Sequence, residues 1–78
     1  MILEIITPEK VAFKGEVTSV KLPGTSGEFE VLNNHAPIIS TLTRGSIRVI
    51  KADNNTEIFD VNGGVIEMQN NKIIVLAD

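Results

Sequence analysis

The sequence contains no cysteine, tryptophan or tyrosine, and it has only one histidine. The absence of cysteine excludes disulfides, and a single imidazole without thiols excludes a structural zinc site with the usual nitrogen and sulfur ligands. Seventy-eight residues are also too few to divide between two hydrophobic cores. We therefore expect one domain, residues 1–78, without metal or cofactor, whose stability depends on packing and on any partner that it binds.

Long apolar runs and clusters of one charge are also absent. No apolar run approaches the roughly 20 residues of a membrane-spanning helix, and the first four residues lack the basic start of a signal peptide. Ten acids and seven bases are interspersed, which gives a net charge of −3 without the basic run or stacking aromatics that nucleic-acid binding requires. The sequence predicts a soluble, cytoplasmic chain that neither inserts into a membrane nor binds nucleic acid.

Catalytic groups are scarce as well. His35 is the only imidazole, and nucleophilic catalysis needs a hydroxyl, a base and an orienting group that converge, a set that no pattern here identifies. Because His35 is followed by Ala36 and Pro37, it is more typical of a loop fixed by hydrogen bonds, or of an interface, than of catalysis. We expect no catalytic residue, and we expect Glu28, beside Gly27, to be an ordinary solvated acid.

Branched aliphatic residues are abundant: 11 Ile and 8 Val stand beside 5 Leu and 3 Phe. This composition favours sheet, and no window of 11 or more residues keeps a helical period, since the best helix candidate, 37–42, is short and rich in Ser and Thr. The predicted fold is all-β, a small sandwich or flattened barrel of nine or ten short strands with essentially no helix. Apolar alternation predicts strands at 2–7, 10–14, 16–22, 28–32, 46–51, 56–61, 65–68 and 72–77. The expected core includes Phe13, Val20, Phe29, Val31, Val49, Phe59, Val61 and Val75.

Turn signals separate the predicted strands. Gly15 permits a turn between 10–14 and 16–22, and Pro23-Gly24 begins a turn that residues 25–27 extend into an exposed loop. Asparagine tolerates positive φ, so the pairs at 33–34, 54–55 and 70–71, each between two apolar runs, are predicted to be turns.

Two ligand-bearing motifs are disfavoured. Gly63-Gly64 could suggest a phosphate loop, but Glu67 follows where a lysine or a helix N-terminus is needed, so a tight connection between strands is favoured. A biotinyl or lipoyl carrier domain needs a lysine at a hairpin tip, whereas the predicted tips carry asparagine pairs and the nearby lysines lie in the flanking strands.

Four collinear segments make the chain resemble the epsilon-subunit family of bacterial F-type ATP synthases, which corresponds to delta in mitochondria. They are Gly27-Glu28-Phe29 followed by His35-Ala36-Pro37, then Gly45-Ser46-Ile47-Arg48-Val49, then Gly63-Gly64-Val65-Ile66-Glu67, and finally Val75-Leu76-Ala77-Asp78. The resemblance covers nearly the whole chain. It implies a flattened ten-stranded β-sandwich, which agrees with the spacing of the turns.

The resemblance also implies a function. The chain would be a non-catalytic part of the central rotor, coupling rotation of the c-ring through the gamma subunit to ATP synthesis, peripheral to the cytoplasmic face of the inner (plasma) membrane. Its implied partners are the gamma subunit of the F1 sector and the polar loops of the c-ring in the Fo sector. The implied c-ring contact is Gly24, Thr25, Ser26, Gly27 and Glu28, with Glu28 placed to pair with a basic loop residue. The implied gamma contact is Thr7, His35, Pro37, Ile38, Ser40 and Leu42.

The sequence departs from the family pattern at two places. Glu30 and Asn33 stand where the family commonly has Gly and often has Pro, which bears on the backbone of the loop. Many members also continue into a C-terminal helical hairpin that inhibits hydrolysis and in some cases binds ATP, whereas this sequence stops at Asp78, so we expect neither property from these 78 residues. An alternative function is a free-standing β-sandwich module for a small ligand or peptide, which predicts a concave pocket with convergent polar groups.

Overall fold

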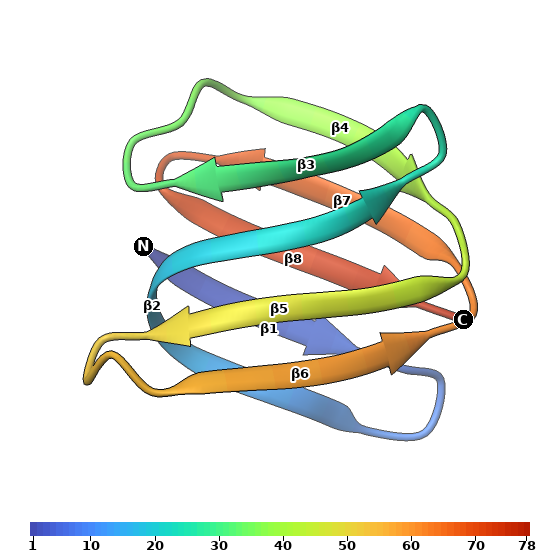
Figure 1. Ribbon diagram of the computed structural model, residues 1–78, viewed down its shortest axis with the longest axis horizontal. Helices are drawn as coiled ribbons and strands as arrows, with labels where there is room; N and C mark the ends of the chain where they lie inside the picture. The colour runs from blue at the N-terminus through green and yellow to red at the C-terminus, as the bar shows by residue number, and fades with distance from the viewer.

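The computed structural model describes all 78 residues and contains eight β-strands and no helix (Figure 1). The all-β prediction is confirmed, and no helix is present that could reach across a bilayer. The strands are β1 (Ile2–Ile6), β2 (Val11–Gly24), β3 (Gly27–Leu32), β4 (Ile38–Leu42), β5 (Gly45–Lys51), β6 (Thr56–Val61), β7 (Gly64–Gln69) and β8 (Lys72–Ala77).

The strands form a sandwich whose two layers share the long strand β2. The first half of β2 pairs with β1, and its second half pairs with β3 on one side and β5 on the other. One layer therefore contains β4, β7, β8, β1 and the first half of β2, while the other contains β3, the second half of β2, β5 and β6 (Figure 1). β1 pairs with β8 in parallel, whereas every other pair is antiparallel.

The core lies between the layers and consists of alternate side chains from each strand. Sixteen buried hydrophobic residues form one cluster, which includes the five predicted valines at 20, 31, 49, 61 and 75. The three phenylalanines are half-buried and pack against the margin of this cluster, where Phe13 and Phe59 meet edge to face with ring centroids 5.7 Å apart. The predicted core is thus correct for the valines, whereas the phenylalanines are only partly buried and lie at its margin.

The continuity of β2 departs from the prediction. A turn at Gly15 is wrong, because Gly15 lies within the strand and pairs with Leu3 of β1. Antiparallel pairing from Val11 to Glu16 keeps this segment extended, and the two strands predicted on either side of Gly15 are one. Residues 38–42, for which no strand was predicted, form β4 by pairing with β7. The sandwich therefore has eight strands rather than nine or ten.

The asparagine turns are confirmed by their backbone. Asn34, Asn54, Asn70 and Asn71 all have φ between 53° and 69°, the left-handed conformation that asparagine adopts at lower cost than other residues with a side chain. The connection from β2 to β3 is shorter than predicted. Gly24 pairs with Gly27, which has a φ of 126°, so only Thr25 and Ser26 remain as a two-residue hairpin turn.

Candidate interaction surfaces

The predicted c-ring residues form the tip of the β2–β3 hairpin. Thr25 and Ser26 are exposed at the turn, whereas Gly24 is buried and its Cβ position would lie only 2.6 Å from the carbonyl oxygen of Gly27. The tip is also tied to the other layer, because the Thr25 N–H donates to the Thr41 carbonyl (3.1 Å) and the two threonine hydroxyls are 2.8 Å apart. The tip is therefore a short, braced corner of the sandwich and not a long protruding loop.

Glu28 lies on β3 beside this turn and already has a partner. Its Oε1 is 3.1 Å from Nζ of Lys21 on β2, and both side chains are partly exposed. A basic residue of another chain would therefore meet an acid whose charge is partly compensated. Lys21 was not among the sequence-predicted site residues, and the pair becomes visible only from the β2–β3 register, in which Glu28 lies across from Pro23.

His35 and Pro37 lie at the opposite end of the molecule, in the exposed segment between β3 and β4 (Figure 1). The His35 N–H donates to the Leu32 carbonyl (3.1 Å), and Nδ1 of His35 lies 2.7 Å from the Ala36 carbonyl oxygen. The neighbouring Asn34 N–H donates to Oδ1 of Asn71 in the β7–β8 turn (2.8 Å). These bonds agree with the structural role predicted for the loop around His35.

The side chains of β4 alternate between the core and the surface. Ile38 and Ser40 are half-buried, and Leu42, predicted to contact gamma, is 5 % exposed and belongs to the core cluster, so its side chain is turned away from the surface of this domain. Between them, Ile39 points outward and is 74 % exposed. A one-residue shift along a strand exchanges its two faces, which is why the exposed residue is the neighbour of those predicted.

Thr7 is also separated from His35. It follows β1 at the end of the molecule where the Thr25-Ser26 turn lies, and its N–H and hydroxyl both bond to the Lys10 carbonyl. β1 and β4 run in the same direction in one layer, so Thr7 after β1 and Pro37 before β4 mark diagonally opposite corners of that layer (Figure 1). The structure thus does not bring the predicted gamma residues into one small patch.

An apolar surface lies between those corners. We call it the apolar face, and its outward side chains are Ile6, Val11, Ile39, Val65, Ile74 and Leu76. The strand register aligns Val65 with Leu76, Leu76 with Ile6, and Ile6 with Val11, so that four strands contribute to one row. A shallow depression of about 240 Å³ opens on this face, lined by Ile39, Val65, Glu67, Ile74 and Leu76. In the sequence, the unbroken apolar run 73–77 is the signal that could have indicated it, since a strand that is apolar on both sides has two surfaces to cover.

The outer surface of the other layer carries charged and polar groups. We call it the polar face, defined by Ser19, Lys21, Glu28, Glu30 and Arg48. The Ser19 hydroxyl donates to Oε2 of Glu30 (2.5 Å), and Nη2 of Arg48 donates to the same oxygen (2.7 Å). The hydrogen bond from Ser19, followed by the charge of Arg48, lowers the pKa of Glu30 below its ordinary value. The network holds side chains of three strands together without forming a catalytic set.

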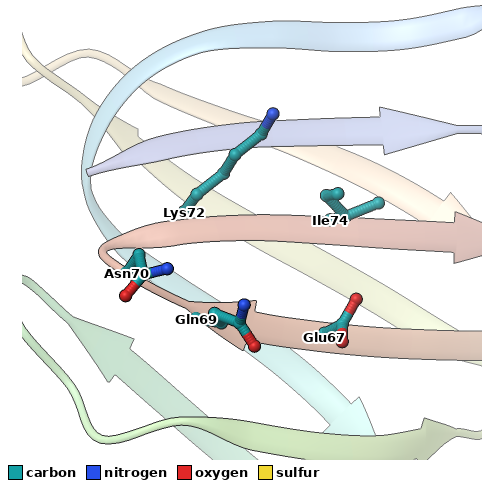
Figure 2. Close-up of a pocket in the computed structure, with 5 residues that line it drawn as sticks. All are labelled: Glu67, Gln69, Asn70, Lys72 and Ile74. Atoms are coloured by element: carbon teal, nitrogen blue, oxygen red, sulfur yellow. The ribbon is translucent and has the colours of Figure 1, made fainter.

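A third surface feature is a shallow depression of about 250 Å³ beside the β7–β8 turn, lined by Glu67, Gln69, Asn70, Lys72 and Ile74 (Figure 2). Its side chains diverge, and Lys72 extends away from Glu67 toward β1. The depression lacks the enclosed shape and convergent polar groups of a small-molecule site.

Comparisons with known proteins match the whole chain. A family model described as "ATP synthase, Delta/Epsilon chain, beta-sandwich domain" covers residues 1–78. The ATP synthase epsilon chain of Chlorobium limicola is 41 % identical over 76 residues, which are 97 % of this chain and 86 % of that protein. The epsilon chain of Campylobacter jejuni is 47 % identical over 74 residues, which are 95 % of this chain and only 57 % of that protein.

Solved structures show the same fold. The Euglena gracilis mitochondrial ATP synthase, in its OSCP/F1/c-ring structure, contains a chain that matches with a TM-score of 0.92 and 19 % identity, covering 99 % of this chain and 49 % of the other. The central stalk and c-ring of the Tetrahymena thermophila mitochondrial ATP synthase contain a chain that matches with a TM-score of 0.80 and 17 % identity, covering 99 % and 62 %.

Proposed function

This chain belongs to the ATP synthase delta/epsilon chain family, and on that premise we propose that it is a non-catalytic central-stalk subunit of an F-type ATP synthase. It couples rotation of the c-ring through the gamma subunit to ATP synthesis at catalytic sites on other chains. The family match over residues 1–78 supports this role, together with a braced, helix-free sandwich that has one apolar outer face. As part of such an enzyme the chain belongs to a membrane-associated complex, and we propose that it lies at the cytoplasmic face.

The c-ring contact in this proposal is the β2–β3 hairpin tip, Gly24 to Glu28. Thr25, Ser26 and Glu28 supply exposed polar groups, while the two glycines shape the turn. Lys21 joins this surface through its ion pair with Glu28. The c-ring loop would therefore meet a base and an acid side by side, and charge complementarity at such a rim sets orientation and specificity more than affinity.

The gamma contact in this proposal is the apolar face. His35 and Pro37 at one corner and Thr7 at the opposite corner border it, so a partner that covers the face reaches both. Ile38 and Ser40 are half-buried on β4 and border the contact. The exposed side chains of Ile39, Val65 and Leu76, rather than the buried Leu42, make the apolar contact in this proposal. An exposed apolar surface of several strands, bordered by polar residues, is typical of a protein–protein interface. This face is the single observation that carries the assignment of gamma.

The test is co-expression with the gamma subunit of the same organism, followed by size-exclusion chromatography. We expect a complex with the wild-type chain, and we expect Leu76→Asp to abolish or greatly weaken it. The matched control is Ile58→Asp, because Ile58 on the other layer is 55 % exposed and Leu76 is 54 % exposed. No complex with the wild type would overturn the proposed function, whereas equal loss in both variants would overturn only the choice of face.

A free-standing ligand-binding module is not favoured. That alternative predicts a concave pocket with convergent polar groups, and the three depressions of about 240 to 320 Å³ are all open at the surface, with the side chains of the one in Figure 2 diverging.

A further inference from the structure

Asn62 combines three features that no other asparagine of the chain combines. It is the only one of the seven that is followed by glycine. It is exposed in the bend between β6 and β7, and its side chain makes no hydrogen bond. The side chains of Asn34, Asn54 and Asn70 also make none, but no glycine follows them. Oδ1 of Asn33 accepts from the Met1 amino group, Oδ1 of Asn71 accepts from the Asn34 N–H, and Nδ2 of Asn55 donates to Asp53. The Asn62 amide is therefore free to rotate toward its own backbone.

Gly63 supplies the second reactant. Because it has no Cβ, nothing on Gly63 hinders the approach of its backbone nitrogen to the Asn62 side chain. Gly63 lies between β6 and β7, and its backbone N–H donates no hydrogen bond. Its φ of 146° is one that residues with a side chain rarely adopt. The Gly63 nitrogen is thus adjacent to the Asn62 side chain and is not engaged as a hydrogen-bond donor; the Asn62 side chain is exposed to water, whereas Gly63 itself is buried.

We propose that Asn62 is a site of spontaneous deamidation through a cyclic imide with Gly63. The Gly63 nitrogen attacks Cγ of Asn62, a C–N bond forms, and the side-chain amide nitrogen leaves as ammonia with the proton from the backbone. Water then opens the five-membered ring at either carbonyl, giving aspartate or isoaspartate at position 62. One amide and one water become one carboxylic acid and one ammonia, so no enzyme, oxidant or reductant is required. Asparagine is one of the residues that heat-resistant proteins use sparingly because of its chemical lability.

The product would alter one end of the sandwich. Asn62 shares a surface depression of about 320 Å³ with Asp60 and Arg44, so a carboxylate at 62 adds a second negative charge there. Isoaspartate also adds a methylene to the main chain beside Gly63, whose carbonyl accepts the Asp78 N–H (3.1 Å) and whose Cα faces the Leu42 carbonyl. This junction connects β6 in one layer to β7 in the other, so lengthening it loosens the fit between the layers. We expect the modified chain to unfold at a lower temperature.

The experiment incubates the purified chain at neutral and mildly alkaline pH in water enriched in heavy oxygen, then maps its peptides by mass spectrometry. We expect Asn62 to convert fastest of the seven asparagines and to take up one heavy oxygen per event. Isoelectric focusing should show the net charge move from −3 to −4, that is, −3 − 1. Faster conversion at any other asparagine, or conversion at Asn62 without heavy oxygen, would overturn the proposal.

Asn62→Gln is the decisive variant, since glutamine keeps the amide and would need a larger ring. We expect this variant to fold normally and to lose the charge shift. If it acquires the extra charge at the wild-type rate, the site lies elsewhere and the proposal is wrong. Gly63→Ala is less useful, because its Cβ would lie 2.8 Å from Oδ2 of Asp78 at a positive φ. The measurement needs only the isolated chain, so its outcome is independent of the proposed function.

Discussion

The two layers of the sandwich share one core but differ in what they present outward. The apolar face places Val65, Leu76, Ile6 and Val11 in adjacent register positions across four strands. On the polar face, the corresponding row is Glu30, Lys21 and Arg48, and the exposed Leu32 and Ile58 stand singly on its two edge strands. Scattered apolar side chains are normal on a soluble surface, whereas a continuous row has a cost that a partner can relieve.

Alternating strands in the two layers therefore serve two purposes. A strand with one polar side has a single apolar side to bury, and the core covers it. The second half of β2 is an example, with Lys21 outward and Leu22 inward. β8, with Ile74 and Leu76 outward and Ile73 and Val75 inward, is apolar on both sides. Its inner side stabilises the domain, and in the proposed function its outer side binds gamma.

The largest expected effect separates core from surface on β4. Leu42→Asp should unfold the domain, because an unpaired charge in the core costs several kcal/mol, a large share of the total stability of a small domain. The adjacent Thr41→Asp, with an outward side chain, should leave the fold intact. Circular dichroism during thermal unfolding measures both. A folded Leu42→Asp variant would contradict the burial of this side chain.

The next effect compares the two sides of β8. Ile73→Ala removes a fully buried side chain and should cost roughly 2–5 kcal/mol in the free energy of unfolding. Leu76→Ala, on the exposed side, should cost no more than about 0.5 kcal/mol. Urea titration of the two variants gives both values. Similar losses at the two positions would show that the apolar face is already covered in the isolated chain, for example by a second copy.

On the polar face, a smaller effect is expected from its hydrogen-bond network. Ser19 is buried at 4 % exposure and its hydroxyl donates to Glu30, so Ser19→Ala should lower the free energy of unfolding by about 1 kcal/mol. Thr56→Ala, at an exposed position of the same layer whose hydroxyl makes no hydrogen bond, is the control. If both substitutions have the same effect, the hydroxyl of Ser19 does not contribute through this bond.

The same network predicts a dependence of stability on pH. The pKa of Glu30 is lowered first by the Ser19 hydrogen bond and then by Arg48. Because the folded-state pKa lies below the unfolded one, Glu30 stabilises the domain above its ordinary pKa, and this contribution is lost as the pH falls through the folded-state value. Glu30→Gln should therefore flatten the decline in thermal stability on acidification. If the variant loses thermal stability on acidification as steeply as the wild type, other carboxylates account for the decline.

The smallest effect on stability is expected at the hairpin tip. Glu28→Lys removes an exposed ion pair with Lys21, so the free energy of unfolding should change by no more than about 1 kcal/mol. In the assembled enzyme, however, the variant should reduce proton-driven ATP synthesis if the tip contacts the c-ring. The swapped double variant, Lys21→Glu with Glu28→Lys, restores the pair with its direction reversed. Wild-type synthesis in the single variant would remove Glu28 from the contact.

Local patterns predicted much of this fold. Alternation located seven of the eight strands within a few residues, and the asparagine pairs predicted turns because their conformational preference is local. Gly15 misled the prediction because a glycine permits a turn without requiring one, and pairing with β1 decided the matter. β4 was missed because its extended conformation is set by pairing with β7, and its Ser and Thr carry no clear period.

Composition and local pattern were enough to predict a helix-free β domain without disulfides, and the order of the motifs indicated the family. The pairing of distant strands was needed to show which side of each strand faces outward, that Leu42 belongs to the core while Ile39 is exposed, and that Glu28 is paired with Lys21. Strand propensity and turn preference act within a few residues and can therefore be read locally. Burial and ion pairing depend instead on register between strands far apart in the chain, where a shift of one residue exchanges the two faces.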